Sequence, residues 1–171
     1  EIRRITLCLQ GIGGMHTDLG SKTFEAVDVA IREACRIVGA TAEQRGVRIR
    51  CEVPHMPLLP LRGAVMRGMV FNLMRNAIDA CANDGDIHLQ ASVSASGQKL
   101  VLSVRDNGRG MTELEAQRCC DIFFTTKEHG SGVGLPICKQ AVERVGGTLR
   151  IESRPGAGTL VTVEVPIAAP A

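Results

Sequence analysis

Three polar side chains near the middle of the chain are spaced to share one face of a helix. Asn72, Asn76 and Asp79 follow i, i+4, i+7 spacing, which places them in a stripe roughly 60° wide on an α-helix. Amide oxygens are hard neutral ligands suited to Mg²⁺, which takes its other ligands from water and substrate phosphates. The pattern predicts a helix that offers Asn72 and Asn76 to a metal ion, with ordinary surface asparagines as the alternative. Another side of the same turns is apolar and consists of Val70, Met74, Ala77, Ile78 and Cys81.

A carboxylate, Asp106, stands where a predicted strand runs into a glycine turn. The strand over 100–104 alternates in polarity, and the block Asp106-Asn107-Gly108-Arg109-Gly110 follows it. A carboxylate in this position can accept a hydrogen bond from an exocyclic amine, and Gly108 and Gly110 leave room for the backbone to approach a flat ring. Taken alone, Asp-Asn-Gly is better explained as a turn.

A third block, Gly130-Ser131-Gly132-Val133-Gly134, precedes a helical pattern. Pro136 fits that helix only in its first turn, where its missing N–H is not needed. A helix N-terminus after glycines offers free backbone N–H groups and a partial positive charge, so the block predicts a phosphate site. A glycine hinge leading into a helix is the alternative. The apolar positions predicted for the helix are Ile137, Ala141, Val142 and Val145.

These blocks occur in a fixed order, with Phe123-Phe124-Thr125-Thr126-Lys127 between the second and third and Gly156-Ala157-Gly158-Thr159 at the end. Together they resemble the ATP-binding catalytic domain of the bacterial sensor histidine kinases. That family belongs to the group holding gyrase, Hsp90 and MutL, whose members bind ATP without a Walker-type loop. The resemblance covers the chain from about Phe24 to Pro166.

The resemblance implies ATP and Mg²⁺ as cofactors. It matches Asp106 to the residue that reads the adenine amino group and Thr159 to the hydroxyl that supports it, and it makes the segment 127–134 a mobile lid. The catalytic residues it implies are Asn72, Asn76 and Lys127. The nucleotide-binding residues it implies are Asn76, Asp79, Asp106, Gly108, Gly110, Thr125, Thr126, Lys127, Gly130, Gly132, Val133, Gly134, Leu135 and Thr159.

One position bears on the type of reaction. In ATP-hydrolysing relatives, and in the serine kinases that inactivate sigma factors, a glutamate four residues before the key asparagine polarises the attacking group. Asn72 stands in that place, and an amide cannot act as a general base at pH 7. A histidine kinase is therefore favoured over an ATPase or serine kinase of the same group. A degenerate scaffold that binds no nucleotide is disfavoured by the intact Asp106, Asn76 and glycine blocks.

The acceptor histidine is expected outside this chain. The resemblance implies an acceptor on a bundle helix, followed by an acidic and a basic residue, and none of the four histidines has those neighbours. We interpret them as surface or turn residues: His16, His55, His88 and His129. The expected partners are a histidine-bearing dimerisation domain of the same parent kinase and a downstream response regulator. Cys120 and Ile122 depart from the phenylalanine and proline usual in the family, so the base of the lid is expected to pack loosely.

The remaining sequence predicts an α/β two-layer sandwich of the Bergerat type. Five alternating segments, over 47–53, 87–93, 100–104, 149–151 and 161–165, indicate a mixed, mostly antiparallel five-stranded sheet with one solvated face. Helices are predicted over 27–45, 63–83 and 134–146, covering the other face, with a shorter one over 112–119. We divide the chain into the tail of a dimerisation helix and linker (1–20), the catalytic domain (21–167) and a disordered tail (168–171).

Composition sets broad limits. The net charge is +2 and the basic residues are scattered, so we expect no nucleic-acid partner. No apolar run approaches the roughly 20 residues of a membrane span, and no secretory leader is recognised. We expect a cytoplasmic location without direct membrane contact, although a parent sensor can be anchored elsewhere. The seven cysteines lack metal-type spacing and suit a reducing compartment. Cys119-Cys120 is a candidate oxidant sensor if a thiol pKa is lowered.

Overall fold

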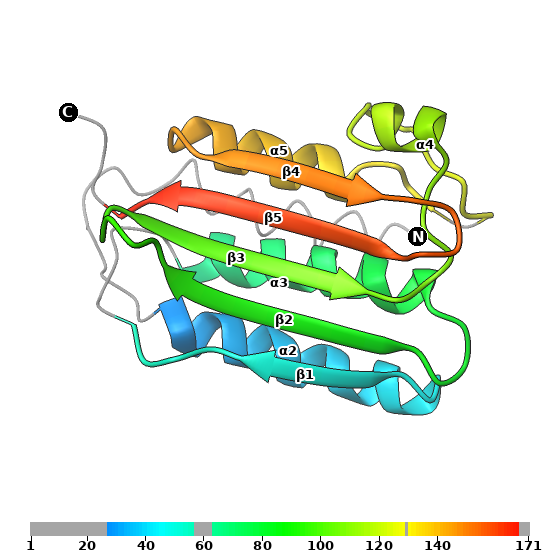
Figure 1. Cartoon of the computed structure of the whole chain (residues 1–171), viewed down its shortest axis with the longest axis horizontal. Helices are drawn as coiled ribbons and strands as arrows, with labels where there is room; N and C mark the ends of the chain where they lie inside the picture. Colours follow the sequence, from blue (N-terminus) through cyan, green and yellow to red (C-terminus); the bar gives the residue numbers. More distant parts are fainter. Residues whose placement is uncertain (1–26, 57–62, 129, 168–171) are drawn as a thin grey trace.

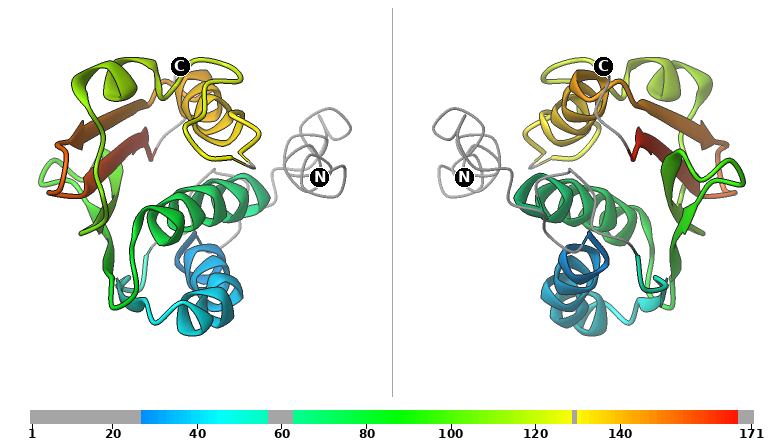
Figure 2. Two further views of the ribbon diagram at one scale, coloured as in Figure 1. Left: turned by 90° about the vertical axis from the view of Figure 1, so that its right-hand side faces the viewer. Right: turned by 90° about the vertical axis from the view of Figure 1, so that its left-hand side faces the viewer.

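The computed structural model describes residues 27–56, 63–128 and 130–167, and within them a five-stranded sheet carries its helices on one face. Figure 2 shows the sheet edge-on, with helices packed along one side of it. The helices are α2 (Val27–Gln44), α3 (Gly63–Ala80), α4 (Glu113–Arg118) and α5 (Gly134–Arg144), and the strands are β1 (Arg48–Glu52), β2 (Asp86–Val93), β3 (Lys99–Asp106), β4 (Thr148–Ser153) and β5 (Thr159–Pro166) (Figure 1).

The strand order is β1-β2-β3-β5-β4. The β1–β2 pair is parallel and the other three pairs are antiparallel, which confirms the predicted mixed, mostly antiparallel sheet. The parallel pair arises because α3 crosses between β1 and β2, as a parallel connection requires. The two-layer architecture is therefore the predicted one.

The core lies between the sheet and α2, α3 and α5. On β3, Leu100, Leu102 and Val104 are buried, and β2 and β5 contribute the same alternation. The α3 residues buried in this core include Val70, Met74, Ala77 and Ile78 of the predicted apolar stripe, together with Met66, Met69 and Leu73. Cys81, the last residue of the predicted stripe, lies just beyond α3 and is partly buried. Because the apolar stripe of α3 is held by the sheet, its polar stripe is fixed in orientation.

The predicted helix boundaries differ from the structure at their C-terminal ends. The helix predicted over 63–83 ends at Ala80, because Gly85 N–H bonds to Ala82 O and Asp84 has a positive φ of 65°, which turns the chain into β2. The other helices lie within two residues of their predicted limits. On α5, Cys138 and Val142 are the buried residues, whereas Ile137 and Ala141 are only half-buried.

Several predictions fall outside the described residues. These are the dimerisation-helix tail over 1–20, the tail over 168–171, and the surface interpretation of His16 and His129. Within the described ranges, none of the helices combines the length and the apolar character needed to cross a bilayer.

Candidate functional site

A cavity of about 970 Å³ opens between α3, α5, the ends of β3 and β5 and the segment that follows α4. Of the fifteen residues predicted to bind nucleotide or metal, thirteen line it: Asn72, Asn76, Asp79, Asp106, Gly110, Thr125, Thr126, Lys127, Gly130, Gly132, Gly134, Leu135 and Thr159. The other two, Gly108 and Val133, do not line it. Predicted residues as far apart in the sequence as Asn72 and Thr159, which are 87 positions apart, thus surround one space.

The polar stripe of α3 meets a lysine from the predicted lid. Lys127 Nζ donates to Asn76 Oδ1 at 2.9 Å and to Asp79 Oδ2 at 3.0 Å. The other oxygen of Asp79, Oδ1, accepts from Arg45 at the end of the α2 region, at 3.1 Å. The Asn76 amide oxygen is therefore directed toward the ammonium group of Lys127.

Asp106 is the buried carboxylate of the cavity. It is 7% exposed, and its Oδ1 accepts from the backbone N–H groups of Gly108 (2.9 Å) and Thr159 (3.2 Å). Burial raises the pKa of this carboxyl, against the lowering effect of the two backbone hydrogen bonds. Among the described residues no group donates to Oδ2, so this oxygen can accept from a ligand in the cavity.

Thr159 supports Asp106 through its backbone N–H, whereas the resemblance implied its hydroxyl. The Thr159 hydroxyl lies 2.9 Å from the hydroxyl of Ser153, which also contacts Gly158 O. Ser153 further accepts from Met111 N at 2.9 Å, and so joins the loop after β3 to the β4–β5 turn. The sequence did not single out Ser153, because its partners come from other segments of the chain.

The reason given for Gly108 is wrong, because it does not line the cavity, and Gly110, which does, is also required by packing. A Cβ on Gly108 would lie 2.5 Å from Ala80 O, and one on Gly110, where φ is +66°, would lie 1.9 Å from Arg154 O. The space beside each glycine is filled by protein backbone. These glycines let the loop pack against the C-terminus of α3 and the β4–β5 turn, and thereby fix Asp106 at the cavity wall.

The N-terminus of α5 faces α3 across the cavity. Its N-cap residue, Val133, makes no side-chain capping hydrogen bond, and the carbonyl of Val133 accepts from Ile137 N at 3.1 Å. A Cβ on Gly134 would lie 3.8 Å from Cγ of Asn72, so the start of the helix and the polar stripe of α3 are neighbours. Backbone donors and amide oxygens therefore meet at one end of the cavity.

The base of the predicted lid is held by a tight backbone contact. Phe123 N donates to Gly132 O at 2.9 Å, and both residues have positive φ, 67° and 64°. A Cβ on Gly132 would lie 2.4 Å from the Phe123 carbonyl carbon, so only glycine fits there. The side chains of Ile122 and Phe123 are 69% and 77% exposed, so they add little packing at this point.

A second basic residue, Arg109, joins the lid to the rest of the wall. Its guanidinium donates to Thr126 Oγ1 at 2.5 Å and to Glu115 Oε1 at 3.2 Å. Glu115 belongs to the capping box of α4, formed with Thr112. Neither Arg109 nor Arg45 was predicted. Arg109 lies between Gly108 and Gly110, and this position inside a motif could have identified it as a site residue. Arg45 lies in none of the motifs.

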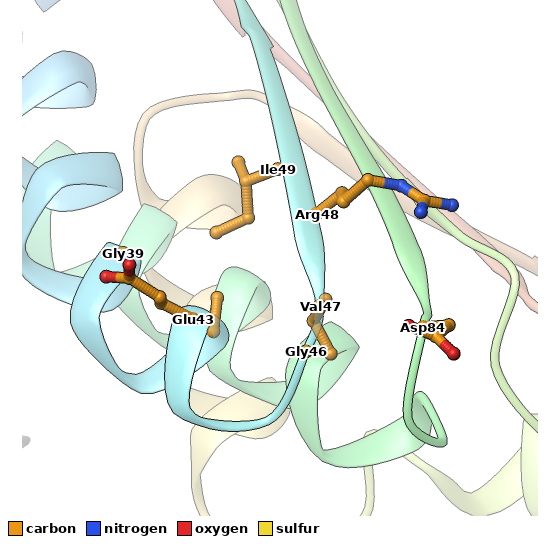
Figure 3. Close-up of a pocket in the computed structure, with 8 residues that line it drawn as sticks. Gly39, Glu43, Gly46, Val47, Arg48, Ile49 and Asp84 are labelled. Carbon is orange, nitrogen blue, oxygen red and sulfur yellow. The ribbon is translucent and has the colours of Figure 1, made fainter.

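A smaller hollow of about 340 Å³ lies where α2 leads into β1 (Figure 3). It contains none of the predicted site residues. Arg48 lies on the opposite side of β1 from Ile49 and is held by both carboxylate oxygens of Asp86, at 2.8 and 2.9 Å. Because the Arg48 guanidinium is already paired with Asp86, we assign no function to this hollow.

The adjacent thiols predicted as a candidate oxidant sensor differ in acidity. A hydrogen bond from Cys119 lowers the pKa of Cys120 to about 7. The same hydrogen bond and the burial of Cys119 raise the pKa of Cys119. Cys119 also contacts Ala116 O at 3.1 Å. One thiol of the pair thus has the lowered pKa that an oxidant sensor requires, and the sensing role itself stays a prediction.

The comparison with known families agrees with this geometry. Residues 64–169, more than half of the chain, match the family described as histidine kinase-, DNA gyrase B-, and HSP90-like ATPase. The chain belongs to that family. The matched range begins in α3 and runs through β5, and so includes every wall of the cavity except the contribution from α2.

Curated relatives of the chain include a sensor histidine kinase and a sporulation kinase. The chain is 32% identical over 150 residues to the sensor histidine kinase ZraS of Escherichia coli (strain K12), covering 84% of this chain and 31% of ZraS. It is 28% identical over 163 residues to sporulation kinase B of Bacillus subtilis (strain 168), covering 92% and 38%. The chain thus spans about a third of the length of these relatives.

Solved structures share the fold. The nucleotide-free catalytic domain of histidine kinase ThkA superposes with a TM-score of 0.74 at 25% identity, over 84% of this chain and 93% of that one. Full-length ShkA in complex with AMPPNP gives a TM-score of 0.78 at 21% identity, over 99% of this chain and 37% of that one. The predicted fold class is confirmed by these superpositions.

Proposed function

We propose that this chain is the ATP-binding catalytic domain of a two-component sensor histidine kinase. It binds Mg²⁺-ATP and presents the γ-phosphate to a histidine on a separate dimerisation domain. The observation that carries the proposal is the meeting of three features around one cavity: the buried carboxylate Asp106, the amide stripe of α3 and the uncapped N-terminus of α5.

The adenine end of the site is built around Asp106. Two backbone N–H groups hold Oδ1, and Oδ2 is left to accept from the exocyclic amine of adenine. Apolar side chains beside it, Val104, Met111 and Val161, supply surfaces for the faces of the ring. Guanine has a carbonyl oxygen at that position, which would present a lone pair to the carboxylate in place of a donor. The Asp106 carboxylate therefore favours adenine over guanine.

The phosphate end lies between α3 and α5. Asn76 is the residue that would hold Mg²⁺, with Asn72 beside it, because amide oxygens suit this ion and Asn76 Oδ1 already faces a cation. When bound, the ion neutralises charge on the β- and γ-phosphates. In this proposal, phosphate oxygens accept from backbone N–H groups of Gly134 and Leu135, which line the cavity at the start of α5. Lys127 must leave Asn76 and is then free to approach the γ-phosphate.

The acceptor in this proposal comes from outside the chain. Asn72 cannot deprotonate a hydroxyl or water, whereas an imidazole already carries a lone pair that can attack phosphorus. The chain's own contribution is positioning and charge neutralisation. The partners we propose are the histidine-bearing dimerisation domain of the parent kinase and a response regulator, in the cytoplasm. An ATPase or serine kinase of the same family is the second candidate, and the amide at position 72 disfavours it.

A calorimetric titration of the chain with ATP, with and without Mg²⁺, tests the proposal. We expect saturable binding that is tighter with the metal, and weaker binding of GTP by at least about tenfold because of the Asp106 pair. GTP bound as tightly as ATP would contradict the adenine assignment. No binding of either nucleotide would place the chain in the degenerate scaffold class.

A further inference from the structure

Two thiols from different elements lie in contact at the edge of the domain. Cys35 on α2 and Cys51 on β1 have their Sγ atoms 3.3 Å apart. Both residues are half-buried, and β1 is an edge strand of the sheet. Neither residue lines the nucleotide cavity, so the proposed function makes no use of this pair.

The charge of a nearby guanidinium acts on both thiols. Arg32 lies one turn before Cys35 on α2 and donates to the carbonyl of Val53, two residues after Cys51. The hydrogen bond with Cys35, and after it the charge of Arg32, lower the pKa of the Cys51 thiol to about 7. The same hydrogen bond, together with burial, raises the pKa of Cys35. The pair therefore consists of one thiolate-forming sulfur and one protonated sulfur in contact.

We propose that Cys35 and Cys51 form a modification site at which a hydroperoxide closes a reversible disulfide between α2 and β1. The Cys51 thiolate attacks the peroxide oxygen, so that an S–O bond forms, the O–O bond breaks, and the leaving oxygen takes a proton. Cys35 then attacks the sulfur of the sulfenic acid. The S–S bond forms, the S–O bond breaks, and the leaving hydroxide combines with the Cys35 proton as water. Two thiols lose two electrons and the peroxide gains them.

The other described thiols fit this chemistry less well. Cys119 and Cys120 are adjacent, so a disulfide between them would close an eight-membered ring that strains the peptide between them. Burial and the charge of Asp106 raise the pKa of Cys81, which therefore has little thiolate to react. Cys81 serves as an internal reference for slow oxidation.

The test is peptide mapping of the whole chain after brief treatment with a small excess of hydrogen peroxide, alkylation of the remaining thiols and digestion. We expect a Cys35–Cys51 cross-linked peptide two hydrogen masses lighter than its parts, removed by a thiol reductant, with Cys81 still alkylated. The oxidised chain should also unfold at a temperature roughly 5 °C higher, because the cross-link restricts the unfolded state. A peroxide-treated chain without this peptide would overturn the proposal, as would equal cross-linking in urea.

Single variants separate the two steps. In Cys35→Ser the reaction should stop at a sulfenic acid on Cys51 that dimedone labels, whereas in Cys51→Ser residue 35 should stay reduced. Labelling of Cys35 in Cys51→Ser as fast as labelling of Cys51 in Cys35→Ser would contradict the assigned order of attack. The wild-type mapping does not depend on the folding of either variant.

Discussion

Replacement of Asp106 by asparagine should lower ATP affinity by roughly 30- to 1,000-fold while leaving the fold intact. The carboxylate is buried, and its Oδ2 is the acceptor for the adenine amine in the proposed site. In the variant, an amide NH₂ placed there would oppose the amine, donor against donor. Such a mismatch of a buried charge-assisted hydrogen bond costs about 2–4 kcal/mol. Calorimetry on a variant whose circular dichroism is unchanged measures the loss.

A matched control is available for this substitution. Asp84 is exposed in the turn after α3, lines the smaller hollow of Figure 3, and has a φ of 65° that asparagine accepts readily. Asp84→Asn should bind ATP like the parent chain. An Asp106→Asn variant with ATP affinity within threefold of the parent would remove Asp106 from the adenine site.

Replacement of Asn76 by alanine should weaken Mg²⁺-ATP binding by about tenfold or more and metal-free ATP binding much less. The proposed role of Asn76 is to ligate the metal, and the loss of its oxygen matters only when the ion is present. The variant also frees one contact of Lys127, which keeps its ion pair with Asp79 at 3.0 Å. Titrations with magnesium and with a chelator give the two affinities.

Asn83→Ala, in the exposed turn beyond α3, is the control for this variant. It removes the same kind of side chain close to Asn76 in the sequence, and the affinities for ATP with and without Mg²⁺ should both stay unchanged. Equal losses with and without the metal in Asn76→Ala would show that Asn76 contacts the nucleotide itself. Unchanged affinities would mean that the polar face of α3 does not form the metal site.

Local periodicity explains why much of the fold was predictable. The alternation of β3 identified Leu100, Leu102 and Val104 as buried, and helical spacing placed Asn72 and Asn76 on one face of α3. Both patterns repeat over a few residues, so the chain carries them without reference to its tertiary structure. The family resemblance supplied what periodicity lacks, namely that the blocks surround one nucleotide site.

Contacts between distant segments were not predictable. Lys127 meets Asn76 across 51 residues, and Arg45 meets Asp79 across 34. No sequence pattern relates such partners, because the loop conformations between them decide whether the side chains meet. The misassigned role of Gly108 has the same origin: a glycine shows that something approaches the backbone closely, but the sequence does not say that it is Ala80.

Transfer of label from γ-radiolabelled ATP tests the central claim most directly. The chain is incubated alone, and together with the separately prepared dimerisation domain of its parent kinase. We expect no labelling of the chain itself, negligible phosphate release, and slow labelling of the dimerisation domain, since separating the two halves removes the effective concentration of a tethered acceptor. The label should be acid-labile and base-stable, as phosphohistidine is. Acid-stable label on the chain itself, or brisk phosphate release that depends on Asn72, would contradict the account and make the chain a serine kinase or an ATPase.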